Sequence, residues 1–279
     1  MTLFQRVLLV IAFTAALPVS AGSGKLIGTA GLNQLEGAGG GGIVPWATLS
    51  GYDSDSEVSV NAFLTRVNLD DYRLQVAGAS VSLYDRVEVS VARQTFDLTT
   101  LGGDISQNIY GAKVRLWGDV VYSAMPQISA GVQFKDLQDE AIANALGSAD
   151  TSGTDYYVSA TKVHLGAVAG YNLVWNLTAR MTNANQMGLL GFGQTSDDDY
   201  EVMLEGSVGV LLNRNVAVGA EYRQKPDNLG LGEEDWWDVF VTYIPSKSFN
   251  VTLAWAELGS IAGAPDQNGI YLSLGGQLW

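Results

Sequence analysis

The sequence contains no cysteine and a single histidine, His164, among its 279 residues. The absence of cysteine excludes disulfide frameworks and cysteine-ligated zinc or iron–sulfur sites. Basic residues are also scarce, because 15 Lys and Arg stand against 29 Asp and Glu, for a net charge of −14. Nucleic-acid binding needs a basic surface, so nucleic acid is excluded as a partner. No sequence motif indicates a cofactor.

Long apolar runs are missing after the first 21 residues. Those residues combine Arg6, an apolar run from Val7 to Leu17 and a small-x-small site at 19–21, which is typical of a cleaved secretory signal peptide. We therefore predict a signal peptide over 1–21 and a single domain over 22–279. Without Arg6 the mature net charge is 14 minus 29, or −15. No later stretch offers the roughly 20 apolar residues of a membrane helix, so a membrane-spanning domain would have to be a closed barrel.

Alternation of apolar and polar residues is the main signal in the rest of the chain. In 172–182, Leu173, Leu177 and Met181 share one face, whereas Thr178 and Arg180 lie on the other. Period-two segments of about ten residues, broken by Gly, Asn, Asp and Pro, are typical of transmembrane β-barrels. The second faces are polar or small, which suits a wet or tightly filled lumen better than the dry core of a soluble sandwich.

Counting such segments predicts an all-β, antiparallel up-and-down barrel of about fourteen strands, with twelve as the alternative. The expected strands lie near 25–34, 43–52, 57–67, 72–83, 86–97, 106–117, 126–135, 153–164, 171–182, 200–212, 215–224, 235–244, 248–257 and 268–278. Short connections such as 84–85 and 213–215 alternate with long ones such as 136–152 and 183–199. Short periplasmic turns and longer extracellular loops are the rule in the outer membrane, where we place the protein.

Aromatic residues are predicted to form two girdles, as at the two interfaces of a membrane. At the short-turn end these are Tyr84, Trp117, Tyr122, Tyr171, Tyr243, Phe249 and Trp279. At the long-loop end they are Phe96, Phe134, Tyr156, Tyr200, Tyr222, Trp237 and Trp255. Expected partners are therefore outer-membrane lipid and lipopolysaccharide. The last strand and Trp279 resemble the signal read by the outer-membrane assembly machinery, although Trp279 is out of phase with the outward leucines.

Several stretches resemble one proteobacterial family, catalogued only as a domain of unknown function (number three thousand and thirty-four). They are Gly-Gly-Ile-Val-Pro-Trp at 41–46, Asn-Ala-Phe-Leu-Thr-Arg-Val at 61–67, Tyr-Val-Ser-Ala-Thr-Lys at 157–162, Gly-Leu-Leu-Gly-Phe-Gly at 188–193, Ala-Val-Gly-Ala-Glu-Tyr-Arg-Gln-Lys-Pro-Asp-Asn-Leu at 217–229 and Tyr-Leu-Ser-Leu at 271–274. The resemblance covers nearly the whole mature chain. It implies an outer-membrane location and carries no activity or site residue with it.

Other candidate sites in the sequence are weak. His164 is expected at a short-turn strand end without a nucleophile beside it, so we predict no catalytic site and no enzyme. Asp197–Asp199 lacks the spacing of a calcium loop, and we predict no metal site. The run Gly39–Gly42 has no following lysine and is expected to be a flexible connection. In the loop 136–152, one helical face predicts a short helix capped by Gly147, which could fold into the barrel mouth or rest on the rim, with the rim favoured. The residues of this face are Leu137, Ala141, Ile142, Ala145 and Leu146.

The strongest candidates are ionisable residues that the alternation points inward, because charge on the lipid face costs roughly 2–4 kcal/mol at mid-bilayer. These lumen-lining candidates are Glu88, Lys113, Arg115, Arg180, Glu205, Glu221 and Arg223. They fit either a charged constriction in a pore or a salt-bridge network that fills a closed barrel.

The function expected from these features is a porin-like passive channel or transporter for small solutes. About fourteen strands would enclose more space than side chains alone fill. The alternative is a non-conducting structural or adhesive barrel whose extracellular loops bind a partner. A plug formed by an inward helix or by the Gly-rich N-terminal stretch would favour that alternative.

Overall fold

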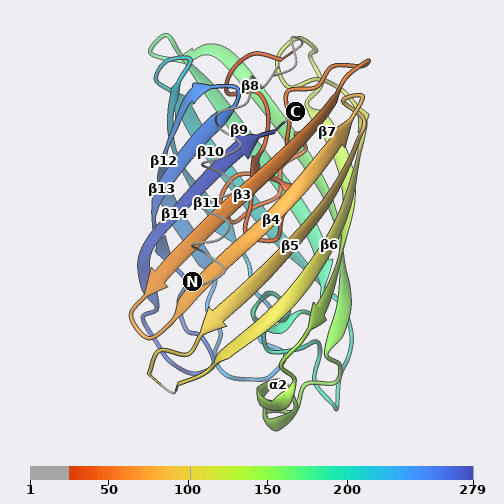
Figure 1. The fold of residues 1–279 in the computed structure, drawn as a ribbon, viewed down its shortest axis with the longest axis vertical. Coiled ribbons are helices and arrows are strands. Elements are labelled where there is room, and N and C mark those ends of the chain that lie inside the picture. The colour runs from red at the N-terminus through yellow and green to blue at the C-terminus, as the bar shows by residue number, and fades with distance from the viewer. Residues whose placement is uncertain (1–24, 101, 279) are drawn as a thin grey trace.

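The wall of the protein is a closed barrel of twelve antiparallel strands. The computed structural model describes residues 25–100 and 102–278. Each strand pairs with the next, and β14 closes the circle on β3 from Gly269↔Leu69 to Gln277↔Asn61 (Figure 1). The strands are β3 (Val58–Leu69), β4 (Arg73–Leu83), β5 (Val87–Asp97), β6 (Asp104–Trp117), β7 (Gln127–Leu137), β8 (Ser152–Val168), β9 (Tyr171–Thr182), β10 (Glu201–Leu211), β11 (Val216–Arg223), β12 (Trp236–Ser246), β13 (Phe249–Glu257) and β14 (Asn268–Gln277).

The predicted antiparallel barrel is confirmed, but fourteen strands was wrong and the alternative of twelve is correct. The two surplus segments, 25–34 and 43–52, do not join the wall. They contribute only a two-residue pairing of β1 (Leu32–Asn33) with β2 (Gly39–Gly40). Every residue from Asn33 to Asp53 is buried except Trp46, which is half-buried. We call residues 33–53 the plug.

The outward face of the wall is apolar. On β9, Leu177 is 63% exposed while its neighbour Thr178 is buried, as the alternation predicts. Val202 and Leu204 on β10 are exposed in the same way. An aliphatic surface of this extent around a closed sheet is stable only against hydrocarbon, so the barrel is an outer-membrane barrel.

The aromatic girdles follow the sequence prediction with one correction. Tyr84, Trp117 and Tyr243 are exposed at the short-turn end, and Tyr156, Tyr222 and Trp237 at the long-loop end. Phe96 instead points into the barrel, where its ring stacks on that of Tyr72 with centroids 4.9 Å apart. Phe96 lies two residues after the buried Gln94 on β5, so its side chain faces the interior like that of Gln94 and not the membrane interface. Trp279 and the predicted signal peptide, 1–21, lie outside the described residues.

The longest connections, 138–151, 183–200, 224–235 and 258–267, lie at one end of the barrel. The opposite end carries the short turns 84–86, 169–170 and 247–248, together with the connection 118–126. In the long-loop end lies helix α2 (Ala141–Leu146), capped by Gly147 at φ 87° and resting on the rim, as predicted (Figure 1). No helix in the described ranges is long and apolar enough to cross a membrane.

A second inward segment closes the long-loop end. The connection from β9 to β10 turns into the barrel mouth through the short helix η1 (Asn185–Gly188), and all residues from 183 to 193 are buried. We call residues 183–193 the lid. The lumen is therefore filled by two segments, the plug in its interior and the lid at its long-loop mouth.

Candidate functional site

Every wall strand carries polar side chains on its inner face, and β3 to β6 also carry apolar ones there, such as Phe63, Leu74 and Ile109. Each of the twelve strands contributes at least one buried polar or charged side chain, from Ser59 on β3 to Gln277 on β14. The plug is held by these side chains rather than by strand pairing with the wall. Its contacts come from nine successive strands, β3 to β11. The candidate site is this contact surface between plug and wall.

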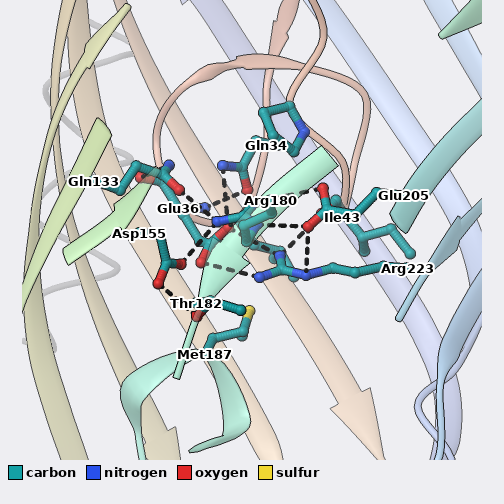
Figure 2. A network of polar contacts seen from close by, with 12 residues as sticks. Gln34, Glu36, Ile43, Gln133, Asp155, Arg180, Thr182, Met187, Glu205 and Arg223 are labelled. Carbon is teal, nitrogen blue, oxygen red and sulfur yellow. Dashed lines mark hydrogen bonds and ion pairs between the residues drawn. The ribbon is translucent and has the colours of Figure 1, made fainter. Parts of the chain in front are cut away.

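Glu36 is the centre of the largest group of contacts (Figure 2). It is fully buried and is the only charged residue of the group that belongs to the plug. Its carboxylate accepts from Arg223 Nη1 at 2.9 Å, lies 3.1 Å from Arg180 Nη2 and forms an ion pair with Lys135. Three wall strands, β7, β9 and β11, therefore hold one plug side chain.

Two further carboxylates balance the charge around Glu36. Asp155 Oδ2 lies 2.7 Å from Lys135 Nζ and 2.9 Å from Arg180 Nη1. Glu205 Oε1 lies 2.5 Å from Arg180 Nε and 3.5 Å from Arg223 Nε. The group thus contains three carboxylates and three cations, all of them buried. We call these six residues the Glu36 network, which is neutral only while the plug is in place.

A second anchor joins the plug to Glu88 and Lys113, which face each other at 3.4 Å. The Glu88 carboxylate accepts from the backbone N–H of Gly39 at 2.8 Å and of Ser50 at 2.6 Å. Lys113 Nζ donates to the carbonyl oxygens of Gly39 and Thr48 at 2.6 and 2.8 Å. The wall ion pair therefore satisfies two donors and two acceptors of plug backbone.

Glu221 forms the third anchor. Its Oε2 accepts from the backbone N–H groups of Gly42 and Ile43 at 2.5 and 2.8 Å, and its Oε1 accepts from Ser207 Oγ at 2.6 Å. A second carboxyl group, Asp238, stands opposite Glu221 on β12 and is buried with it.

The run Gly39–Gly42 is packed, not the flexible connection that was expected. A Cβ on Gly39 would lie 2.6 Å from the backbone nitrogen of Ser50. A Cβ on Gly40 would collide with the carbonyl oxygen of Val44, and one on Gly41 with the Glu221 carboxylate. Glycine is required here because backbone amides approach wall carboxylates directly.

Two glutamines connect the lid to the plug. Gln107 Nε2 donates to the carbonyl oxygen of Met187 in the lid at 3.2 Å and to Gln94 Oε1 at 2.6 Å. Gln94 Nε2 in turn donates to the carbonyl oxygen of Leu35 in the plug at 2.9 Å. The two inward segments therefore share one hydrogen-bonded chain through β5 and β6.

A family model described as "Protein of unknown function (DUF3034)" matches residues 29–275. The chain belongs to this family. Among proteins of curated function, none matches this sequence.

Several solved barrels are similar in fold. The KdgM porin is 9% identical, with a TM-score of 0.49 over 77% of this chain and 98% of its own. The NanC porin is 10% identical, with a TM-score of 0.47 and coverages of 77% and 97%. Outer membrane protein Omp33 of Acinetobacter baumannii is 10% identical, with a TM-score of 0.45 and coverages of 80% and 100%. At these identities and scores, the similarity to this chain is one of fold alone.

Six of the seven lumen-lining candidates predicted from the sequence are buried inside the barrel. They are Glu88, Lys113, Arg180, Glu205, Glu221 and Arg223. The structure places Arg180, Glu205 and Arg223 in the Glu36 network, and the other three at the second and third anchors. Arg115 lies apart at the short-turn end, where it pairs with Asp85 and lies 3.4 Å from Asp119.

Sequence reasoning missed Glu36, Lys135, Asp155 and Asp238. Lys135 and Asp155 continue the inward register of their strands, so the alternation could have identified them. Glu36 lies between 25–34 and 43–52, the two segments that the alternation wrongly predicts as wall strands. No local pattern indicates that Glu36 enters the lumen.

The weaker candidates lie away from the plug. His164 is exposed near the short-turn end of β8, and its Nε2 accepts from Trp175 Nε1 at 3.0 Å. Asp197–Asp199 are exposed in the connection that follows the lid.

Proposed function

We propose that the protein is a gated channel for small polar solutes, in which the plug must leave its seat before solute passes. The observation that supports this most is the polar inner face of the wall. Water can replace the hydrogen bonds and ion pairs that the wall makes to the plug, whereas the apolar contacts of Leu35, Ile43 and Val44 would be lost. A lumen vacated by the plug would therefore be a hydrated pore rather than an exposed apolar core.

The buried charges support the same proposal. Removing ions from water costs several kcal/mol each, and well-packed apolar residues often stabilise a core as well or better. A barrel that is filled permanently gains nothing from the three carboxylates and three cations of the Glu36 network. A wall that faces water during part of its working cycle needs them. Charges of both signs in the lumen predict weak discrimination between anions and cations.

A reversible crosslink between plug and wall tests the proposal. Ser50 Oγ of the plug lies 2.7 Å from Ser80 Oγ on β4, and the chain has no cysteine of its own. In the S50C/S80C variant a single disulfide can therefore lock the plug in place. We expect planar-bilayer recordings to show openings after reduction and none after oxidation.

The matched control is a crosslink within the wall. Thr242 and Thr252, on β12 and β13, have hydroxyl oxygens 2.8 Å apart and do not touch the plug through a hydrogen bond. T242C/T252C should conduct equally in both redox states. Openings that persist in oxidised S50C/S80C would show that solute does not need the plug to move.

The alternative function is a non-conducting structural or adhesive barrel. The contacts of nine strands to the plug favour it, because so many bonds describe a filled barrel as well as a gate. Absence of openings in both redox states of S50C/S80C, and in the wild type, would support this alternative and reject the channel.

A further inference from the structure

An apolar cavity of about 70 Å³ lies beneath the lid at the long-loop mouth. Met187, Leu189 and Leu190 of the lid form one side of it. The opposite side comes from wall and loop residues, among them Tyr72, Phe96, Ile105, Trp236, Leu258 and Ile261. The cavity contrasts with the polar seat of the plug, so its chemistry requires a separate explanation.

One residue that lines the cavity carries an unused hydrogen-bond donor. Trp236 is 2% exposed, and in the described part of the chain its indole Nε1 has no hydrogen-bond partner. A buried donor without an acceptor costs about 1–3 kcal/mol, and such groups often indicate a ligand or a functional role. A molecule that enters the cavity with one acceptor atom would satisfy this donor.

The cations beside Trp236 are already occupied. Arg223 and Lys225 lie over its ring at 5.5 and 5.6 Å. Arg223 is bound within the Glu36 network, while Lys225 Nζ donates to Glu233 at 2.6 Å and to the Ser260 carbonyl oxygen at 2.7 Å. Neither cation is available to a charged ligand without losing its carboxylate, which favours a neutral acceptor group.

The backbone of the lid is locally strained. Gln186 and Met187 both have positive φ, 47° and 61°, which residues other than glycine rarely adopt. Such strain persists only while surrounding contacts enforce it. At about 70 Å³ the cavity is smaller than the roughly 150 Å³ that holds a benzene ring, so a ring-sized ligand must displace the lid.

We propose that this cavity binds a small, neutral, mainly apolar molecule with one hydrogen-bond acceptor, which Trp236 Nε1 recognises. Access is from the long-loop end, past the lid. The proposal does not depend on conduction by the barrel. If the cavity binds this molecule and the barrel also conducts, the hydrogen bonds from Met187 through Gln107 and Gln94 to Leu35 would connect ligand binding to the plug.

Fluorine NMR on the full chain in lipid nanodiscs tests the proposal, with 4-fluorobenzyl alcohol and 4-fluorotoluene as probes. We expect saturable binding of both probes and tighter binding of the alcohol. W236F removes the donor and also replaces the indole by a smaller phenyl ring, so the enlarged cavity affects both probes, while loss of the donor should weaken the alcohol about 2- to 10-fold relative to the toluene. Equal effects on the two probes would overturn the role of the indole N–H.

A second variant distinguishes the cavity from lipid. I105W fills the cavity from wall strand β6 and should abolish saturable binding, whereas L177W adds the same ring to the lipid-facing wall and should not. Binding that survives in I105W, or that merely equals partition into protein-free nanodiscs, would overturn the site. Because W236F removes bulk and adds none, it remains informative even where I105W fails to fold.

Discussion

Neutralising Glu36 should unseat the plug without unfolding the barrel. Glu36 is the only member of the Glu36 network contributed by the plug, and it faces Lys135, Arg180 and Arg223. E36Q preserves the shape of the side chain but leaves three buried wall cations with two carboxylates. In the unseated state water solvates the exposed wall charges, so the penalty applies only to the seated plug.

The size of the effect follows from the burial of the pair. Removing one partner of a buried ion pair costs about 3–5 kcal/mol. At about 1.4 kcal/mol per factor of ten, the ratio of unseated to seated plug should rise roughly 10²- to 4 × 10³-fold. The twelve-stranded wall keeps all of its backbone pairing in this variant.

Thiol labelling measures this ratio directly. Ser50 is 1% exposed in the plug, and S50C would be the only cysteine of the chain. A water-soluble maleimide should label S50C slowly in the wild-type background and faster in E36Q by up to the same factor. E201Q removes a carboxylate from an exposed rim position and should leave the rate unchanged. An unaltered rate in a folded E36Q barrel would refute the assignment of Glu36 as the anchor.

Two other predictions concern the wall and the lid. L177K places a charge at the middle of β9 on the lipid face and should destabilise the folded barrel by about 2–4 kcal/mol in a urea titration, whereas N176K on the luminal face would disturb the plug instead. Q107L cuts the hydrogen-bonded chain between Met187 and Gln94, so labelling of S50C should become faster, while Q138L on the exposed rim should have no effect.

The wall could be predicted from the sequence because each strand has two different environments. Hydrocarbon outside and polar groups inside impose a period of two, which places Leu177 outward and Thr178 inward from sequence alone. The first two segments, 25–34 and 43–52, resemble strands but do not have hydrocarbon on one face and the lumen on the other. Residues 33–34 and 43–52 are enclosed by protein, apart from the half-buried Trp46, so they follow no such division. Pro45 also lacks a donor for a ladder, and its carbonyl oxygen instead accepts from Thr178 Oγ1 at 2.7 Å.

The candidate site could be predicted only on its wall side. The alternation predicts that the side chains of Arg180, Glu205 and Glu221 face the lumen. It does not predict which groups those side chains contact there. Glu36 approaches Arg223 across 187 positions of sequence, and the glycine amides reach Glu221 across 179. Contacts of this range depend on how the plug folds back into the barrel, for which the chain carries no local periodic signal.

Hydrogen–deuterium exchange of the refolded protein tests most directly whether the N-terminal segment is a plug held by wall carboxylates. The informative amides are those of Gly39, Gly42, Ile43 and Ser50, which donate to Glu88 and Glu221. These amides should exchange together, far more slowly than the exposed segment 195–200 and faster than the wall strands. Exchange of all four at the rate of that segment would contradict the account, because residues 33–53 would then not occupy the lumen.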